Sequence, residues 1–169
     1  MSKILIVVAS VNKNMELAQT LASEVESQGA APEIVDLVEL GLPLFTSIRE
    51  GEEGVPKTAG ELSARMASAR GLIFVAPEYN GGIPPVLTNA FAWISRSGDD
   101  WRAGFNGKLA AIATHAGGGG LHVLAAMRVQ LSYLGVTVLG RQLQTNFNKP
   151  LNPESATAVV KQLLALTAP

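Results

Sequence analysis

The chain has 169 residues, of which 47% are hydrophobic, and its 13 basic and 14 acidic side chains give a formal net charge of −1. This length and hydrophobic content predict a single globular domain over residues 1–169. The balanced charge gives no sign of nucleic acid or an anionic membrane as a partner. The sequence contains no cysteine, which excludes disulfides, thiolate metal sites and cysteine nucleophiles within it. The first apolar run, residues 4–9, is too short for a signal-peptide core or a membrane span, so we expect a cytoplasmic protein.

The first half of the chain alternates buried-strand patterns with helical patterns. Residues 3–9 (KILIVVA) predict a buried strand, because the run is apolar from residue 4 onward, as in a strand covered on both faces. A polar loop at 10–14 precedes a helix that Gly29 can end, and its apolar face comprises Leu17, Ala18, Leu21, Ala22 and Val25. Residues 33–37 predict a second strand. Residues 38–56 contain three glycines and two prolines, and we expect a long irregular connection there.

The same alternation continues to the C-terminus. A helix containing Leu62, Met66 and Ala69 should end near Gly71, and residues 72–76 predict the central strand. The next helix opens at Pro84 and Pro85 and carries Val86, Leu87, Ala90, Phe91 and Ile94 at helical spacing. A fourth strand at 108–114, a helix from about residue 121 to Gly135 and a fifth strand at 136–139 follow. Asn152 should cap a last helix that has Pro153 at its first position and a buried stripe of Val159, Leu163 and Leu166.

This order of elements predicts an α/β fold. Five strands alternating with five helices require right-handed crossovers and a doubly wound parallel sheet with helices on both faces. Five strands favour the flavodoxin-like order 2-1-3-4-5 over the six-stranded dinucleotide-binding order. The loops after the first, third and fourth strands should therefore meet at one edge of the sheet, around the topological switch point.

The first of these loops has the chemistry of a phosphate site. Ser10, Asn12 and Asn14 precede a helix N-terminus, where free N–H groups and the helix dipole favour an anion. The alternative is that Asn12 or Asn14 only caps the helix.

Other phosphate and catalytic motifs fit poorly. No G-x-G-x-x-G follows the first strand, and the glycine run 117–120 continues with Leu-His rather than Lys-Ser or Lys-Thr. There is no G-x-S-x-G elbow for a serine nucleophile. His115 and His122 are too few for a convincing metal site, and His122 is best explained as a helix-surface residue.

Residues 77–84 (PEYNGGIP), followed by Leu87, Asn89, Ala90 and Trp93, resemble a long family signature. It is the P-E-Y-N-x-S-I-P-x-x-L-K-N-A-x-D-W motif of the NADPH-dependent FMN reductase family, which includes flavin, quinone, azo-dye and chromate reductases. Residues 36–37 and 42–45 are also similar to the D-L…L-P-L-Y stretch of that family, as is the glycine-rich loop after the fourth strand. The resemblance implies a flavodoxin-like fold and bound FMN, with NADPH or NADH as co-substrate.

The chain departs from the family at several positions. Its first loop is shorter than the usual G-S-x-R-x-x-S-x-N and lacks the arginine, and it is similar to the S/T-x-T-G-N-T-E loop of flavodoxins. Gly82 replaces a serine, and Thr88 and Ala92 replace a lysine and an aspartate. Both families place the FMN phosphate at this loop.

The resemblance implies a cofactor site built from three loops. The phosphate would lie at Ser10, Asn12, Asn14 and Met15. The isoalloxazine would lie along Pro77, Glu78, Tyr79, Asn80 and Gly81, with His115, Ala116, Gly117 and Gly118 at its opposite edge. Tyr79 as a loop-packing aromatic and the glycines as turn formers remain alternatives. Because flavin carries the chemistry, we nominate no catalytic side chain and no metal ligand.

The function implied is an FMN-dependent NAD(P)H oxidoreductase. It would pass a hydride from nicotinamide to FMN and then to a quinone, azo, flavin or similar small-molecule acceptor, in a ping-pong sequence. A flavodoxin-type electron carrier that docks redox proteins, or a regulatory protein without turnover, are the alternatives. Carriers that dock basic partners usually have strongly acidic surfaces, so the net charge of −1 favours the enzyme.

The family habit also implies a homodimer or homotetramer. Trp93, Trp101 and Phe105 surround a loop whose apolar surface would need covering. The connection at 38–56, and above all its tip at 51–54 (GEEG), should border the flavin site or the neighbouring subunit and be mobile.

Overall fold

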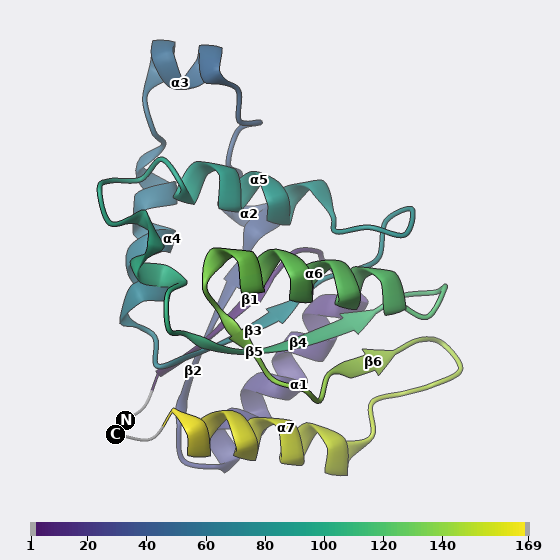
Figure 1. Ribbon diagram of the computed structural model, residues 1–169. Helices are drawn as coiled ribbons and strands as arrows, with labels where there is room; N and C mark the ends of the chain where they lie inside the picture. The colour runs from purple at the N-terminus through teal and green to yellow at the C-terminus, as the bar shows by residue number, and fades with distance from the viewer. Residues whose placement is uncertain (1–2, 168–169) are drawn as a thin grey trace.

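The computed structural model describes residues 3–167 as a parallel sheet between two layers of helices (Figure 1). The strand order is β2-β1-β3-β4-β5, with β6 also paired to β4, and every strand pairing is parallel. This confirms the flavodoxin-like order expected from the sequence. The strands are β1 (Lys3–Val8), β2 (Ala31–Asp36), β3 (Gly71–Val75), β4 (Leu109–His115), β5 (Thr137–Val138) and β6 (Leu143–Thr145).

Helices cover both faces of this sheet. One face packs against α1 (Lys13–Ser27) and α7 (Pro153–Leu166). The other packs against α2 (Leu37–Leu40), α4 (Lys57–Ser68), α5 (Pro85–Ile94), α6 (Leu121–Leu134) and the 3-10 helix η1 (Trp101–Gly104). The short helix α3 (Ser47–Glu53) projects away from both layers (Figure 1).

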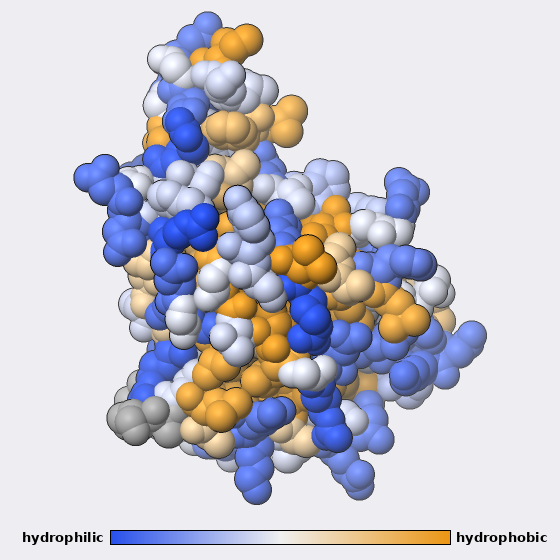
Figure 2. Space-filling view, viewed as in Figure 1, coloured by the Kyte–Doolittle hydropathy of each residue, from blue (hydrophilic) through white to orange (hydrophobic). Residues whose placement is uncertain are grey.

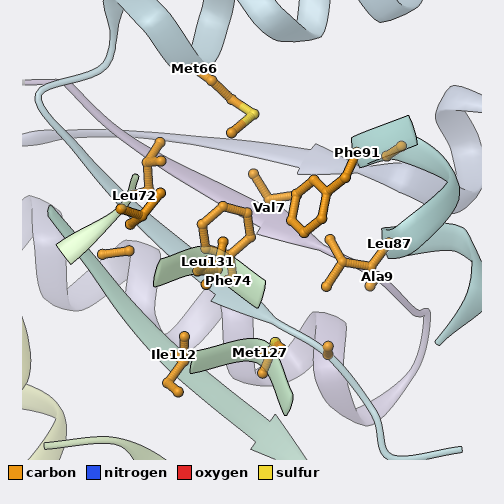
Figure 3. Close-up of a cluster of buried hydrophobic side chains, with 14 of the residues drawn as sticks. Val7, Ala9, Met66, Leu72, Phe74, Leu87, Phe91, Ile112, Met127 and Leu131 are labelled. Carbon is orange, nitrogen blue, oxygen red and sulfur yellow. The ribbon is translucent and has the colours of Figure 1, made fainter. Parts of the chain in front are cut away.

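The inner strands β1, β3 and β4 are almost entirely apolar, since both of their faces are buried. Along β1, Ile4 and Ile6 face the α1 and α7 layer, whereas Leu5 and Val7 face the opposite layer. Figure 3 shows the second of these clusters, in which Phe74 of the central strand lies among side chains of the covering helices. The ring of Phe74 meets that of Phe91 edge to face at 5.8 Å. A strand buried on both faces cannot alternate apolar and polar residues, which explains the uninterrupted runs in the sequence.

The fifth strand differs from its expected form at 136–139. Two short strands, β5 and β6, pair with the two ends of β4, and the chain detours between them. The guanidinium of Arg128 on α6 donates to the carbonyl oxygens of Val138, Leu139 and Gly140 at 2.9–3.4 Å. A side chain therefore satisfies these three carbonyls at the point where the chain leaves the sheet.

The connection at 38–56 is more regular than expected, because it contains most of α2 and the whole of α3. Each helix has a side-chain cap: Asp36 accepts from the Val38 N–H at 2.8 Å, and Thr46 accepts from the Arg49 N–H at 3.0 Å. Gly41 ends α2 with a φ of 62°.

Two further expectations about packing were wrong. Leu166 is 56% exposed, since the buried face of α7 ends at Thr167 and places Leu166 on its rim. Trp93 and Phe105 have no exposed surface, so they belong to the core and give no argument for a subunit interface.

The expected Asn152 cap is confirmed, with its side chain accepting from the Ser155 N–H at 2.9 Å. Within residues 3–167, no helix combines the length and apolar character that crossing a membrane requires.

Candidate functional site

The loops after β1, β3 and β4 begin side by side at the carboxyl edge of the sheet. The Ala9 N–H donates to Val75 at 2.9 Å and the Ala76 N–H donates to Ala113 at 3.1 Å, so the strand pairing continues to the start of each loop. The chain runs from β1 to β2 on one side and reaches β3 on the other, which is the switch point where α/β folds bind ligands. The structure therefore brings the three sequence-predicted loops together.

The first loop presents a helix N-terminus without a side-chain cap. Asn12 occupies the N-cap position of α1 with a φ of 57°, and its side chain makes no capping hydrogen bond. The alternative that Asn12 only caps the helix is therefore not what the structure shows. The N–H groups of the first turn lack a capping side-chain acceptor, and they and the helix dipole favour an anion at this position. Ser10 lies beside them, its hydroxyl donating to the Val11 carbonyl at 3.3 Å.

Asn14 ties the first loop to the loop after β4. Its side chain is 4% exposed and pairs with both backbone groups of His115. The amide nitrogen donates to the His115 carbonyl at 3.0 Å, and the amide oxygen accepts from the His115 N–H at 2.9 Å. This pairing engages both ends of the Asn14 amide and fixes the spacing between two loops that lie 101 positions apart in the sequence.

The second loop contains a tight turn over residues 79–82. The N–H of Tyr79 donates to Gly82 at 3.1 Å, and the N–H of Gly82 donates to Tyr79 at 3.0 Å. The central residues Asn80 and Gly81 both have positive φ, 52° and 74°, as the Asn-Gly pair of a type I′ turn does. Their N–H groups lie outside these two hydrogen bonds. The phenol ring of Tyr79 is 52% exposed at the rim of the site.

Glu78 joins the second loop to the third. Its carboxylate, 12% exposed, accepts from the Val123 N–H at 3.1 Å, within the first turn of α6. The exposed imidazole of His122 approaches the same carboxylate at 3.8 Å. Glu78 thus satisfies an otherwise unpaired donor at the helix start and fixes α6 relative to the turn.

The third loop has part of its backbone committed internally. The N–H of Ala116 donates to Thr145 at 3.1 Å, and that of His115 is taken by Asn14. Gln144 on β6 donates its side-chain amide to the Gly119 carbonyl. The N–H groups of Gly117 and Gly118 lie outside the hydrogen bonds that the structure shows, and both residues are exposed. Of the four residues expected to offer donors here, these two remain available.

The remaining predicted residues contribute shape rather than polar groups. Met15 is partly buried and packs against the cluster under α1, and Pro77 is buried at the end of β3. Sequence reasoning missed Gln144 and Thr145, because β6 was not predicted at all. Within the described part of the chain, no three His, Cys, Asp or Glu side chains are grouped closely enough to hold a metal ion.

Two curated relatives with sequence similarity are named quinone reductases. A 2-hydroxy-1,4-benzoquinone reductase of a Burkholderia species is 38% identical over 98 residues, covering 56% of this chain and 50% of that protein. A quinone reductase of Escherichia coli K12 is 34% identical over 114 residues, covering 66% of this chain and 56% of that protein. The chain thus spans about half the length of these two relatives.

Solved structures share the fold at low sequence identity. The flavoenzyme NAD(P)H:(acceptor) oxidoreductase FerB of Paracoccus denitrificans superimposes with a TM-score of 0.75 at 18% identity, covering 99% of this chain and 95% of that one. A WrbA-like flavodoxin of Agrobacterium tumefaciens gives a TM-score of 0.68 at 17% identity, covering 99% and 98%. Residues 2–149 match the sequence profile of one family, so the motif, the strand order and the profile agree. The chain belongs to the NADPH-dependent FMN reductase family.

Proposed function

We propose that this chain is an FMN-dependent NAD(P)H oxidoreductase that reduces a small-molecule acceptor, with quinones as the first class to test. One observation carries the proposal: the uncapped N-terminus of α1 lies at the same sheet edge as two loops with unengaged backbone N–H groups. A phosphate and a flat ring with polar edges need such an arrangement.

The residues present fit FMN. The first turn of α1 offers N–H groups, with the Ser10 hydroxyl and the exposed Asn12 amide beside them, to a phosphate. The N–H groups of Asn80 and Gly81 on one loop, and of Gly117 and Gly118 on the other, would meet the polar edges of the ring. A side chain at Gly81 would be strained by its φ of 74°, so the glycine keeps the turn close and flat.

The protein would supply position and charge stabilisation, while bound FMN supplies the capacity to accept a hydride from nicotinamide and deliver it to the acceptor. Fixed backbone donors stabilise negative charge on a ligand without reorganising, because their loops are held by Asn14 and Glu78. Tyr79 is exposed at the rim, where it would contact whichever substrate occupies the ring face. A single place for nicotinamide and acceptor implies a ping-pong sequence.

The relatives support the acceptor class. Two are named quinone reductases, and an FMN-dependent NADH:quinone oxidoreductase of Shewanella frigidimarina is 28% identical across 99% of this chain. The alternative of a non-enzymatic carrier has the same fold, since an archaeal flavodoxin superimposes with a TM-score of 0.67. The fold is therefore compatible with both an enzyme and an electron carrier, and only a measurement of turnover distinguishes them.

The test is NADPH or NADH oxidation by FMN-loaded protein with a benzoquinone acceptor, followed at 340 nm. We expect turnover and parallel lines in double-reciprocal plots. Reduced flavin that forms slowly and is reoxidised only by a redox protein would indicate the carrier instead. Binding of FMN should also exceed that of riboflavin at least tenfold, because the α1 N-terminus is built for a phosphate; equal affinity would contradict that assignment.

We propose in addition that the protein acts in the cytoplasm as a homodimer or homotetramer, without nucleic acid or membrane as a partner. One segment that offers apolar side chains for a subunit contact is the projection around α3, where Leu44 is 69% and Ile48 is 71% exposed. Figure 2 shows apolar surface on this projection. Sedimentation equilibrium at micromolar concentration tests the assembly, and a monomer there would contradict it.

A further inference from the structure

A groove of about 480 Å³ lies beside the candidate flavin site, between α1 and the segment that joins β6 to α7. Its lining extends along α1 from Lys13 to Glu24, a length of about 16 Å at the helical rise. No residue of the 77–82 turn and neither Gly117 nor Gly118 lines it. The groove is therefore separate from the four N–H groups assigned to the ring edges, and it shares only His115 with the loop after β4. Its walls include Leu17, His115, Thr145, Phe147, Leu151 and Ala156.

Hydrogen bonding fixes the tautomer of His115 at this groove. The Thr145 hydroxyl donates its one proton to the Thr114 carbonyl at 3.0 Å, so towards His115 it offers only lone pairs. His115 Nδ1 lies 3.1 Å from that hydroxyl oxygen and must therefore carry a hydrogen. Nε2 of the neutral ring is then a bare acceptor. It is buried and has no hydrogen-bond partner.

The surroundings of this acceptor favour an uncharged aromatic ring. Leucine, proline and alanine side chains form the apolar part of the wall, and the Phe147 ring meets the imidazole edge to face at 5.2 Å. The charged residues of the lining already have partners: Lys13 pairs with Glu16 at 2.7 Å, and Glu24 accepts from Gln28 at 2.6 Å. Because Nε2 is itself buried, a ligand reaches it only after a neighbouring side chain moves, and Phe147, which is 78% exposed, would be that side chain.

We propose that this groove binds small phenols, with the phenolic O–H donating to Nε2 of His115 and the ring packing beside Phe147. A quinone has only acceptor oxygens and cannot satisfy Nε2, whereas the dihydroxybenzene formed by its reduction can. The groove would therefore distinguish reduced from oxidised members of one ring class. The proposed function would explain where a dihydroxybenzene comes from, and only this point rests on it; the binding of phenols to the groove does not.

The test compares phenol with anisole, which has the same ring but no hydroxyl donor. Both are titrated into FMN-loaded and FMN-free protein at pH 8, where an ordinary imidazole is neutral, and NMR follows the ¹⁵N signals of the His115 ring. We expect phenol to bind about tenfold more tightly than anisole, the scale of one hydrogen bond, and to shift Nε2 in both forms. Equal affinities, no binding of phenol, or loss of binding when FMN is present would each overturn the proposal.

Variants separate the hydrogen bond from the shape of the groove. His115→Phe keeps an aromatic ring against Phe147 and should abolish the preference for phenol, while His122→Gln, at an exposed histidine, should retain it. Thr145→Val removes the hydroxyl that fixes the tautomer and should reduce the preference for phenol over anisole. Thr145→Ser keeps a hydroxyl at this position and should retain that preference. A preference that survives in His115→Phe would overturn the assignment. None of these measurements requires turnover, so their failure would leave the oxidoreductase proposal standing.

Discussion

The loops at the sheet edge and the projection around α3 are held in different ways. At the sheet edge, side chains of one loop bind the backbone of another: Asn14 holds His115, Glu78 holds Val123, and Gln144 holds Gly119. The projection is anchored only near its base by comparable bonds. There Asn89 accepts from the Phe45 N–H at 2.7 Å and donates to the Pro43 carbonyl at 3.0 Å, and the indole of Trp93 donates to that carbonyl at 2.6 Å.

The two regions differ in how accurately their backbone groups are positioned. Backbone donors can stabilise a ligand only if their positions are fixed before the ligand arrives, and the cross-bracing fixes them. The projection has such bracing only near its base, and its outer contact is the ion pair of Arg96 with Glu50 at 2.7 Å. That pair lies at the C-terminal end of α5, opposite the end that receives the 77–82 turn. The expectation that residues 51–54 border the flavin site of their own chain therefore does not match the structure.

Asn14→Ala should have the largest effect. It leaves both backbone groups of His115 without their Asn14 partners in a partly buried position, so the free energy of unfolding should fall by about 2–3 kcal/mol in chemical denaturation. The dissociation constant for FMN should rise more than tenfold, because two of its loops lose their spacing. Asn12→Gly is the matched control: glycine accepts the φ of 57°, and the Asn12 side chain caps nothing, so the unfolding free energy should stay nearly unchanged. Equal destabilisation by both variants would refute the bracing role.

Asn89→Ala should loosen the projection and spare the site. Three polar backbone groups at Leu42, Pro43 and Phe45 lose a partner, so we expect a loss of about 2 kcal/mol in unfolding free energy. Hydrogen exchange of residues 44–53 should accelerate. The FMN dissociation constant should change by no more than about twofold, which is less than the tenfold change that corresponds to 1.4 kcal/mol of binding free energy. An FMN defect comparable to that of Asn14→Ala would mean that the two regions are coupled.

Patterns local in sequence were predictable, because their physics is local. Burial on both faces gave the inner strands, and the Asn152-Pro153 pair gave the start of α7. The caps of α2 and α3 were also readable, since Asp36 and Thr46 are strong N-cap types. The three glycines and two prolines of 38–56 led to the prediction of an irregular connection in spite of these caps, and that prediction was wrong.

Contacts between distant segments were beyond the sequence. Asn14 reads equally well as a phosphate ligand, a cap or a brace, and only the fold brings it to His115, 101 positions away. The division of the last strand depends on Arg128 reaching three carbonyls from another element. Propensity does not encode such a partner, so β6 and its residues Gln144 and Thr145 went unpredicted.

Glu78→Gln should weaken the link between the turn and α6 without breaking it. An amide oxygen still accepts from the Val123 N–H, but the interaction of a negative charge with the helix N-terminus is lost, so we expect about 1 kcal/mol less stability. FMN affinity should fall a few-fold, measured by fluorescence titration. Glu154→Gln, in the first turn of α7, removes a similar charge away from the site. It should leave FMN affinity unaltered, and a matching fall there would assign the effect to net charge.

Arg96→Met should have the smallest effect on stability. The Arg96 and Glu50 side chains are 50% and 23% exposed, and ion pairs this open to solvent contribute about 0–1 kcal/mol, so the unfolding free energy should change by less than about 0.5 kcal/mol. Methionine keeps the apolar stem that can pack beside α5. The informative reading is local: hydrogen exchange of 47–53 should rise, more so at low salt, where the lost attraction was strongest. If the exchange rates of 47–53 stay unchanged, the hydrogen bonds of Asn89 and Trp93 are enough to hold the projection, and the ion pair between Glu50 and Arg96 is not needed to order α3.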